Sequence, residues 1–379
     1  MAIQSGATIG ILGGGQLGRM IAMAARPLGY RIHTLDPDPS CAARFVVERS
    51  LAAQFDDDFA AADLARHCQV VTLEIEKISL ASIDAASRYC PVRPGRHVLE
   101  IIQDRGRQKA WLEKGGFPLG PWKEISTAEE LSGASSALAG PTFVKSCTGG
   151  YDGRGQFQLA VPAGAQEAFT YLGGGRCVVE RALDIEAELS VLVARRPSGQ
   201  TVVYPAALNH HENRILAWSA LPAPLPEKIT REASDIARAI AEKLQVEGLL
   251  VVELFLTKDG RLLVNELAPR PHNSFHATEV GCLTSQFEQA VRAVCDLPLG
   301  SPEVTRPAAI VNLLGELWLG DKPPAFDKVL ALEGVRLHLY GKRVARPGRK
   351  MGHLSAVGRT SEEAIARVQL AEKVLVGKA

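Results

Sequence analysis

Two glutamates on neighbouring apolar segments have the spacing that points most directly to chemistry. Residues 248–274 contain two runs rich in Leu and Val on either side of Asp259 and Gly260, and an Asp-Gly pair between such runs favours a β-hairpin. A loop centred on this pair places Glu253 opposite Glu266. Facing like charges destabilise a hairpin, so a cation is expected between these carboxylates, and carboxylates with phosphate oxygens are the usual ligands of Mg²⁺. The alternatives are glutamates paired with Arg or Lys, or a solvated edge strand.

A glycine-rich loop between two predicted strands is a second candidate site. The strands are expected at 141–147 and 157–161. The loop between them carries Gly149, Gly150, Gly153 and Gly155. The loop can fold over phosphates as a lid, so that its backbone amides face them. Lys145 on the first strand is placed to contact a phosphate oxygen. The loop is not a P-loop, because no Gly-Lys-Ser/Thr ends it and a strand follows it. A surface hairpin without a ligand is the alternative.

The N-terminal glycine motif fits more than one kind of ligand. Gly13, Gly15 and Gly18 follow a predicted strand at 8–12 and open a helical pattern, and Asp36 ends the next predicted strand. This is the spacing of a dinucleotide-binding turn. The same turn can bind any phosphate, or can serve close packing of helix on strand. A nicotinamide-dependent dehydrogenase is therefore an alternative, although it leaves the hairpin glutamates and the glycine-rich loop without a role.

Two further acidic residues, Glu74 and Glu76, lie at the end of a predicted strand at 70–75. Ligands of open α/β sheets bind at the carboxyl ends of strands, so either glutamate is placed to reach a substrate. Solvated loop carboxylates are the alternative. A helical pattern begins after residue 103, and a domain boundary is expected near residue 104.

Composition excludes several classes of protein. A chain of 379 residues is expected to form about two or three domains. The 43 basic and 42 acidic residues give a net charge of +1, so no overall field favours nucleic acid or an anionic membrane. The seven cysteines include no Cys-x-x-Cys pair, which favours reduced thiols. A signal peptide is not expected, and no segment approaches the roughly 18 apolar residues of a membrane span. We therefore expect a cytoplasmic protein.

Seven motifs spread over almost the whole chain carry a family resemblance. They are ILGGGQLGRM at 11–20, TLEIE at 72–76, GGYDGRGQ at 149–156, NELAPRPHNS at 265–274, TSQFEQ at 284–289, NLLGELW at 312–318 and RPGRKMGH at 346–353. Together they resemble the N5-carboxyaminoimidazole ribonucleotide synthetases, which are ATP-grasp carboxylases of purine biosynthesis. GGYDGRGQ, NELAPRPHNS and RPGRKMGH are the specific motifs of this set, whereas glycine loops alone would not be specific.

The resemblance implies a multidomain α/β and α+β fold. A Rossmann-like pre-ATP-grasp domain is expected at 1–104, and an ATP-grasp domain at 105–298 with a lid at about 120–182. A small β-rich domain is expected at 299–379. The resemblance also implies a homodimer, with small molecules as the other partners and neither nucleic acid nor membrane.

The implied reaction is the ATP-dependent carboxylation of 5-aminoimidazole ribonucleotide with bicarbonate, through carboxyphosphate, in de novo purine biosynthesis. ATP and Mg²⁺ are the implied cofactors, with Mn²⁺ as a possible replacement. Another ATP-grasp ligase that forms an acyl-phosphate on a different ribonucleotide is an alternative. A nucleotide-binding regulatory protein without turnover is another.

The resemblance also assigns roles to residues by motif position. Those expected to bind the nucleotide are Arg105, Lys145, Tyr151, Asp152, Gly153, Arg154, Gly155, Gln156, Phe157, Glu180, Arg181, Ala182, Leu183, Glu188, Asn265 and Glu266. Those expected to hold the ribonucleotide or the carboxylating intermediate are Asp152, Arg154, Arg270, His272, Asn273, Ser274, Lys342 and Arg349. Glu253 and Glu266 are the expected metal ligands. His272, Arg270 and Lys145 are the expected catalytic residues.

The residue chemistry agrees with parts of this assignment. Arg270 lies between Pro269 and Pro271, whose rings restrict the backbone around it. An imidazole such as that of His272 suits a general base, although a hydrogen bond to substrate fits equally well. Relatives usually carry Gly where this chain has Phe275, so the loop there is expected to follow a different path.

Overall fold

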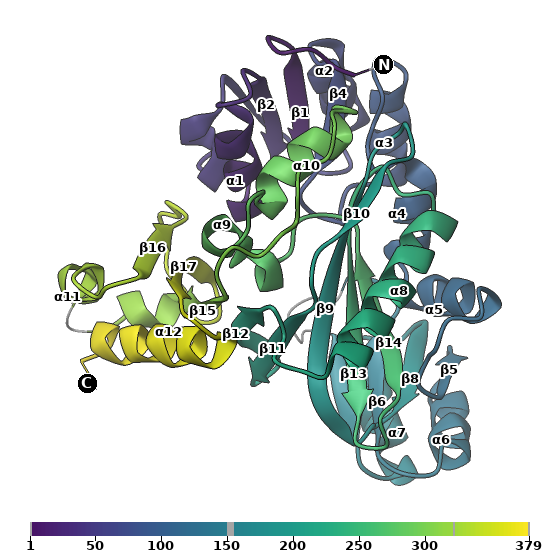
Figure 1. The fold of residues 1–379 in the computed structure, drawn as a ribbon. Coiled ribbons are helices and arrows are strands. Elements are labelled where there is room, and N and C mark those ends of the chain that lie inside the picture. The colour runs from purple at the N-terminus through teal and green to yellow at the C-terminus, as the bar shows by residue number, and fades with distance from the viewer. Residues whose placement is uncertain (1, 150–154, 321–322, 378–379) are drawn as a thin grey trace.

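The computed structural model describes residues 2–149, 155–320 and 323–377, and in this part of the chain the strands form three sheets (Figure 1). The first sheet is N-terminal and parallel. Its strands, in spatial order, are β3 (Arg49–Ala52), β2 (Arg31–Asp36), β1 (Thr8–Leu12) and β4 (Val70–Leu73). The helical segments between and after them are α1 (Gln16–Ala25), η1 (Ala42–Val46), α2 (Asp58–Arg66) and α3 (Leu80–Ser87). β1 is buried along its whole length, as expected for the central strand of a Rossmann-like domain.

The second sheet lies in the segment expected to form the lid. It is antiparallel, and its strands, in spatial order, are β5 (Trp122–Ile125), β8 (Cys177–Arg181), β6 (Thr142–Ser146) and β7 (Gln156–Leu159). The helical segments α6 (Ala128–Ala137), η2 (Pro162–Gly164) and α7 (Ala165–Tyr171) lie in this segment, and α4 (Arg96–Ile102) and α5 (Arg105–Lys114) precede it. Leu131 of α6 and Val144 of β6 belong to a hydrophobic core confined to this sheet and its helices. The lid sheet therefore packs as a unit of its own.

The third sheet forms the centre of the molecule. Its strands, in spatial order, are β14 (Leu262–Ala268), β13 (Gly248–Thr257), β9 (Ile185–Arg195), β11 (Ala207–Glu212), β12 (Ile215–Leu221), β15 (Ala308–Leu314), β17 (Lys350–Val357) and β16 (Val335–Leu339), with β10 (Thr201–Val203) beside β9. The remaining helical segments are α8 (Glu227–Lys243), η3 (Asn273–Phe275), α9 (Thr278–Gly281), α10 (Gln286–Val294), η4 (Gly315–Trp318), α11 (Phe326–Leu330) and α12 (Ser361–Leu375). The C-terminal strands are continuous with the strands of the domain expected at 105–298, because β15 pairs with β12.

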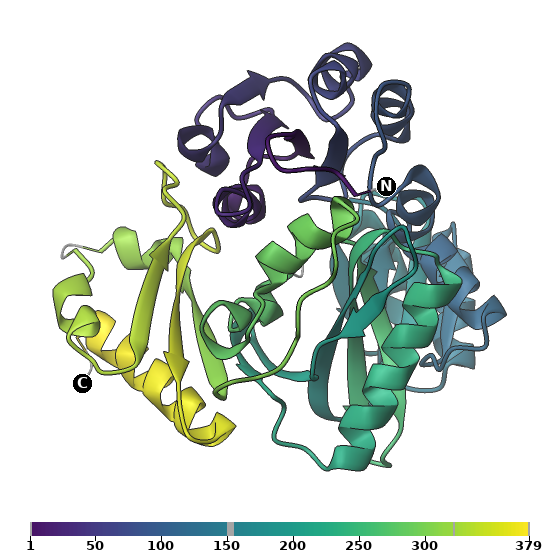
Figure 2. The same cartoon turned by 45° about the horizontal axis from the view of Figure 1, so that its top comes forward.

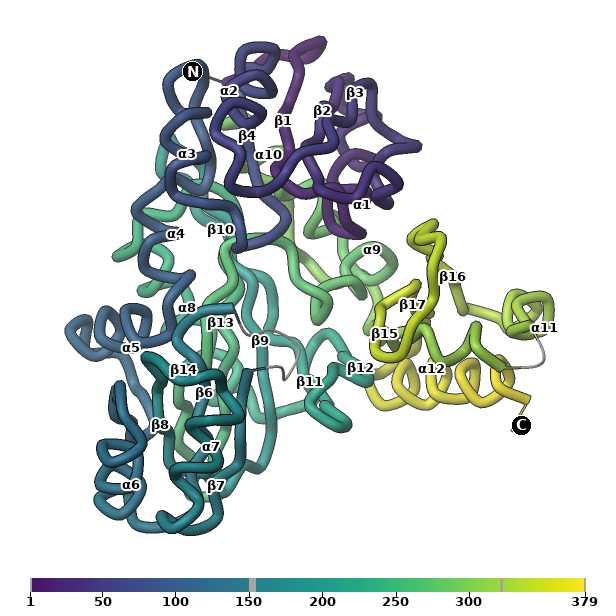
Figure 3. The backbone as a smooth tube through the Cα atoms, turned by 180° about the vertical axis from the view of Figure 1, so that it is seen from behind, coloured from purple at the N-terminus to yellow at the C-terminus, as the bar shows by residue number. Residues whose placement is uncertain are grey.

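Helices fix the position of this sheet relative to the other two. α8 buries Ala233, Ala237, Ile240 and Ala241, whose spacing forms one stripe of the helix. α8 covers the side of β9 and β13 that faces the viewer in Figure 1, and the lid sheet covers the opposite side, which faces the viewer in Figure 3. α10 lies between α1 of the N-terminal sheet and strands β9 and β13 (Figure 2). The face of the hairpin next to the lid is therefore the one left for a site.

The β13–β14 hairpin forms as predicted, but its register arises differently. The loop holds three residues, because the Thr257 N–H donates to the Arg261 carbonyl and Gly260 takes a φ of +81°. This loop alone would shift the pairing by one residue. A β-bulge between Glu253 and Leu254 on one side, with Asn265 as the extra residue on the other, restores it. Glu253 consequently lies opposite Glu266, as the two-residue loop had predicted.

No helix in the described ranges is long and apolar enough to cross a membrane. All seven cysteines are free, and all except Cys282 are buried.

The N-terminal glycine turn is occupied by carboxylates of the chain itself. The N–H groups of Gly15 and Gly18 each donate to Glu74 at 2.6 Å, and the N–H of Gly14 donates to Asp36 Oδ2 at 2.7 Å. Glu74 is 8% exposed, and burial raises the pKa of its carboxyl group although the two amides oppose the shift. The amides that a dinucleotide phosphate would use are therefore already bonded, and the motif serves the packing of α1 on the sheet.

Replacing Glu74 by Ala should show that the glycine turn depends on this carboxylate. The amides of Gly15 and Gly18 would lose their acceptor in a buried site, at a cost of about 2–3 kcal/mol. We expect faster hydrogen exchange in the peptide covering 11–20 and a lower urea midpoint for the N-terminal region. Glu242→Ala, at an exposed position of α8, is the matched control and should change neither. Unchanged exchange in the Glu74 variant would contradict this role.

Candidate active site

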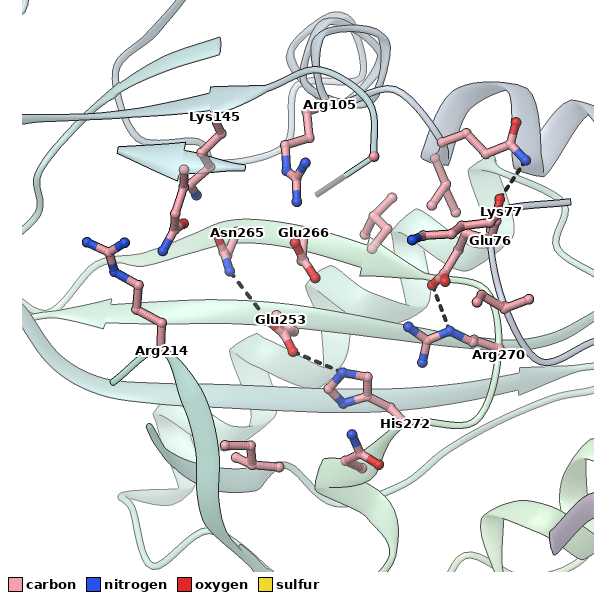
Figure 4. Close-up of a pocket in the computed structure, with 18 of the residues that line it drawn as sticks. Glu76, Lys77, Arg105, Lys145, Arg214, Glu253, Asn265, Glu266, Arg270 and His272 are labelled. Carbon is pink, nitrogen blue, oxygen red and sulfur yellow. Dashed lines mark hydrogen bonds and ion pairs between the residues drawn. The ribbon is translucent and has the colours of Figure 1, made fainter. Parts of the chain in front are cut away.

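A cavity of about 1230 Å³ lies where the three sheets meet. Its lining comes from the lid sheet, the β13–β14 hairpin, the carboxyl end of β4 and the loop between β16 and β17. Figure 4 shows Lys145 and Arg105 on one side of this cavity and Glu253 and Glu266 on the strands across from them. Segments far apart in the sequence therefore share one site.

The two hairpin glutamates are the electrostatic centre of the cavity. Their side chains face each other on adjacent strands, and the Asn265 Nδ2 donates to Glu253 Oε2 at 3.3 Å. The bulge places Asn265 beside Glu266 in the cavity lining instead of on the opposite face of the strand. Burial and the charge of Glu266 raise the pKa of Glu253 to about 7. His211 and Asn265 act in the opposite direction but do not offset this shift.

His272 lies next to this pair. Its Nε2 is 3.3 Å from Glu253 Oε1, and its Nδ1 is 2.8 Å from the Ser274 hydroxyl oxygen. Burial, together with the charges of Arg270 and Lys350, holds the pKa of His272 well below its usual value. The imidazole is therefore neutral near pH 7.

Arg270 is held from the N-terminal domain. Its Nε lies 2.8 Å from Glu76 Oε1, and its Nη1 donates to the Pro271 carbonyl at 3.0 Å. Glu76 is one of the two glutamates considered from the sequence as possible substrate contacts. Figure 4 shows the pair at the edge of the cavity, with the guanidinium directed toward His272 and Glu253.

The lid side carries a second charged group. Glu180 is bonded to Lys109 and lies 2.5 Å from Lys145 Nζ. Burial disfavours its ionised form, but the charges of Lys145 and Lys109 outweigh burial and lower the pKa of Glu180 to about 2. The Arg105 guanidinium donates to the Ser146 carbonyl at 3.0 Å. Three cations therefore converge near β6 and β8, where sequence reasoning had predicted Arg105 and Lys145 but had missed Lys109.

The opposite end of the cavity is basic. Lys342 Nζ donates to Gln16 Oε1 and to the Lys350 carbonyl, both at 2.7 Å. The Arg349 guanidinium donates to the Val344 carbonyl at 2.6 Å, and Arg346 also lines the cavity. These contacts order the loop between β16 and β17 beside the N-terminus of α1.

The lining residues that were not predicted include two basic residues of β11 and the turn after it. His211 Nδ1 lies 2.6 Å from Glu188 Oε2. Burial lowers the pKa of His211, but the hydrogen bond and charge of Glu188 more than offset it, so the pKa is raised. Arg214 follows in the β11–β12 turn, with a φ of +68°, and Figure 4 shows its side chain near Lys145. A sequence signal for His211 was available: it is two residues from Asn209 on a strand, so the two side chains lie on the same face.

The predicted site residues fall into three groups. Those that line the cavity are Arg105, Lys145, Gln156, Glu180, Arg181, Leu183, Glu188, Glu253, Asn265, Glu266, Arg270, His272, Asn273, Lys342 and Arg349. Those that are described but do not line it are Gly155, Phe157, Ala182 and Ser274. Tyr151, Asp152, Gly153 and Arg154 lie outside the described residues. Ser274 is fully buried and bonds His272, and Phe157 packs against Tyr171 with ring centroids 5.5 Å apart.

Phe275 is accommodated without backbone strain. It lies in η3, is fully buried, and packs edge-on against Tyr204 with ring centroids 6.2 Å apart. Among the described residues it is not one of those with positive φ. The neighbouring His276 is also fully buried, and its Nδ1 lies 3.0 Å from Gln286 Nε2. Phe275 is therefore a core residue and does not line the cavity.

Comparison with known proteins agrees with this geometry. Residues 6–103 match the ribonucleotide synthetase preATP-grasp domain, 110–287 match the ATP-grasp domain, and 308–367 match the phosphoribosylaminoimidazole carboxylase C-terminal domain. The N5-carboxyaminoimidazole ribonucleotide synthase of Bacillus subtilis (strain 168) is 39% identical over 97% of this chain and 95% of its own length. The enzyme of that name from Brucella melitensis biotype 1 is 40% identical over 94% and 98% of the two chains.

The chain belongs to the N5-carboxyaminoimidazole ribonucleotide synthase family. A crystal structure of an N5-carboxyaminoimidazole ribonucleotide synthetase with ADP superposes with a TM-score of 0.93 at 40% identity and covers 98% of this chain and 97% of that one. The Aspergillus clavatus N5-carboxyaminoimidazole synthase, in complex with ADP and 5-aminoimidazole ribonucleotide, gives a TM-score of 0.90 at 30% identity, with 98% and 99% covered. The predicted ATP-grasp fold, with its N- and C-terminal domains, and the predicted ATP-grasp ligase class are confirmed.

The raised pKa of Glu253 predicts a pH-dependent stability. Its folded-state pKa of about 7 exceeds the ordinary glutamate pKa of 4.5, so its stabilising contribution is complete below pH 4.5 and is lost as pH rises through 7. Glu253→Gln, measured in EDTA, should therefore be more stable than the unsubstituted chain at pH 8, by up to about 3 kcal/mol. The difference should disappear near pH 4.5.

Glu186→Gln is the control for this measurement, because Glu186 is an exposed carboxylate on the adjacent strand β9. It should leave the pH profile of thermal unfolding unchanged. A Glu253→Gln variant that is equally destabilised at every pH would show that the two carboxylates do not repel each other in the folded chain.

Proposed function

We propose that this chain carboxylates 5-aminoimidazole ribonucleotide on its exocyclic amine, with MgATP and bicarbonate as co-substrates and ADP and phosphate as further products. The observation that carries the proposal is the single cavity that joins the facing glutamates and the lid cations to Arg270, His272 and the basic loop. A phosphate-bearing nucleotide and a ribonucleotide can then meet at one centre. The named relatives support the choice of substrate.

Bicarbonate is a poor electrophile, so the first step is its phosphorylation. The γ-phosphoryl group of ATP passes to a bicarbonate oxygen, giving carboxyphosphate and ADP, and this transfer depends on positioning and charge neutralisation. Lys145 and Arg105 would hold the phosphates from the lid side, across the cavity from the hairpin. Their positive charges oppose the charge that develops on the transferred group.

The second step joins the carboxyl group to the amine. The amine nitrogen attacks the carboxyl carbon of carboxyphosphate, the C–O bond to phosphate breaks, and the amine loses a proton. His272 is neutral and lies beside Glu253, so its imidazole would take that proton. Arg270, fixed by Glu76, would bind the anionic carboxyphosphate, while Lys342 and Arg349 would bind the phosphate of the ribonucleotide.

The residues present fit a magnesium ion. Glu253 and Glu266 offer facing carboxylate oxygens, and a cation between them would oppose the burial and the Glu266 charge that raise the pKa of Glu253. Hard oxygen ligands of this kind suit Mg²⁺ or Mn²⁺. The ion would neutralise charge on the phosphates of ATP at this position.

The domain division at 1–104, 105–298 and 299–379 is part of the proposal. The three matched family ranges fall within these boundaries, and the lid sheet falls within 120–182, which supports the division. The family resemblance implies a homodimer as the assembly and the cytoplasm as the location.

Release of ADP tests the reaction. Purified protein with MgATP should release ADP only when both 5-aminoimidazole ribonucleotide and bicarbonate are present, compared with CO₂-depleted buffer. ADP release that requires the ribonucleotide but not bicarbonate would replace the carboxylase with a ligase acting on another acid. No release under any of these conditions would favour a binding protein without turnover.

His272→Gln tests the proposed base. Loss of a general base lowers kcat by about 10²–10⁴-fold, and we expect the KM for ATP to change little, because the lid cations are untouched. His210→Gln is the matched control, since His210 lies beside His211 on β11 but does not line the cavity. Loss of nucleotide binding with normal carboxylation in single turnovers would remove His272 from this role.

A further inference from the structure

Two histidines and a glutamate converge outside the cavity, behind the basic loop. His338 on β16 and His353 on β17 are direct cross-strand partners, so their side chains stand on the same face of the sheet. Glu279 of α9 approaches both from above that face: its Oε2 lies 3.6 Å from His338 Nδ1 and 3.7 Å from His353 Nε2. None of the three lines the active-site cavity.

We infer that Glu279, His338 and His353 form a binding site for a divalent transition metal of the Zn²⁺ class. One ligand atom from each residue lies within 4.8 Å of the other two. Ligands at about 2.1 Å from a tetrahedral zinc ion are separated from one another by roughly 3.4 Å. The two contacts of Glu279 Oε2 are close to that separation and are longer than a hydrogen bond.

The surroundings of His353 support a ligand role. The Tyr340 hydroxyl oxygen lies 2.9 Å from His353 Nδ1, which leaves Nε2 as the atom that faces Glu279. Histidines that bind metals usually engage their second ring nitrogen in such a hydrogen bond, which fixes the ring orientation. Tyr340 is itself fully buried, so this partner is fixed by packing.

The site is accessible and has room for one further ligand. The side chains of Glu279 and His338 are 29% and 20% exposed, while that of His353 is 2% exposed. An ion would therefore enter from solvent and keep a water molecule as its fourth ligand. His276 stacks on His353 with ring centroids 4.7 Å apart and closes the buried side, although it is not one of the three converging residues.

Ligand chemistry separates this site from the hairpin glutamates. Two imidazole nitrogens and one carboxylate favour Zn²⁺, Co²⁺ or Ni²⁺, whereas the Glu253 and Glu266 carboxylates favour Mg²⁺. Excess Mg²⁺ should therefore saturate the hairpin pair without displacing a transition metal from the histidines. The inference does not depend on the proposed reaction, because it concerns binding at a separate place.

Metal titration of the full chain tests the site. After dialysis against chelator, and with Mg²⁺ in excess, the chain should bind one equivalent of Zn²⁺ in competition with a chromophoric chelator. Co²⁺ should give the intense visible bands of a four-coordinate site. Glu279→Gln and His338→Gln should each weaken binding by at least about tenfold, and Tyr340→Phe should weaken it less while keeping the stoichiometry.

His67→Gln is the matched control. His67 is an exposed histidine 3.8 Å from Asp63, so this variant removes a histidine next to a carboxylate without touching the three ligands. It should bind Zn²⁺ as tightly as the unsubstituted chain, and Zn²⁺ should raise the thermal midpoint of both but not of Glu279→Gln. Absence of stoichiometric binding by the unsubstituted chain, or equally tight binding by both ligand variants, would overturn the inference.

Discussion

The pairing of two facing carboxylates is the constraint on which the rest of the site depends. Like charges on directly paired strands destabilise a hairpin, and Glu253 and Glu266 are both partly buried on neighbouring strands. Such an arrangement persists only if the surrounding structure holds the strands in register and the repulsion is relieved, either by a proton on Glu253 or by a bound cation. The central sheet meets the first requirement, because β13 is paired with β9 along its whole length and with β14 from Val251 to Leu256. The second requirement makes the hairpin a place for function and not for stability.

A bulge adds a third polar side chain, that of Asn265, to the two glutamates on the cavity side of this hairpin. Without it, Asn265 and Glu266 would point to opposite sides of β14, since side chains alternate along a strand. With it, both line the cavity, and Asn265 bonds Glu253. The irregularity is therefore part of the site, and its removal would change the register and the chemistry together.

Local sequence signals predicted the elements well, because their causes are local. Apolar runs and the Asp-Gly turn placed β13 and β14, and the pairing of Glu253 with Glu266 came out right although two deviations from the assumed register cancelled. Contacts between distant segments had no such signal. Lys109 beside Glu180 and Glu188 beside His211 depend on how separate elements pack. The glycine motif shows the same limit, because its spacing fits a bound phosphate and a bound carboxylate equally well.

The TLEIE segment explains why the N-terminal domain belongs to the active site. Glu74 and Glu76 are two residues apart, yet they bind different partners: Glu74 holds the amides of the glycine turn, and Glu76 holds Arg270, which follows the hairpin. Movement of the first sheet would therefore move the acceptor that orients Arg270. Because the turn held by Glu74 also opens α1, whose Gln16 bonds Lys342 of the basic loop, one short strand end aligns groups on both sides of the substrate cavity. Without the first sheet, the hairpin and the lid sheet would keep their own pairing, but Arg270 would lose Glu76 and Lys342 would lose Gln16.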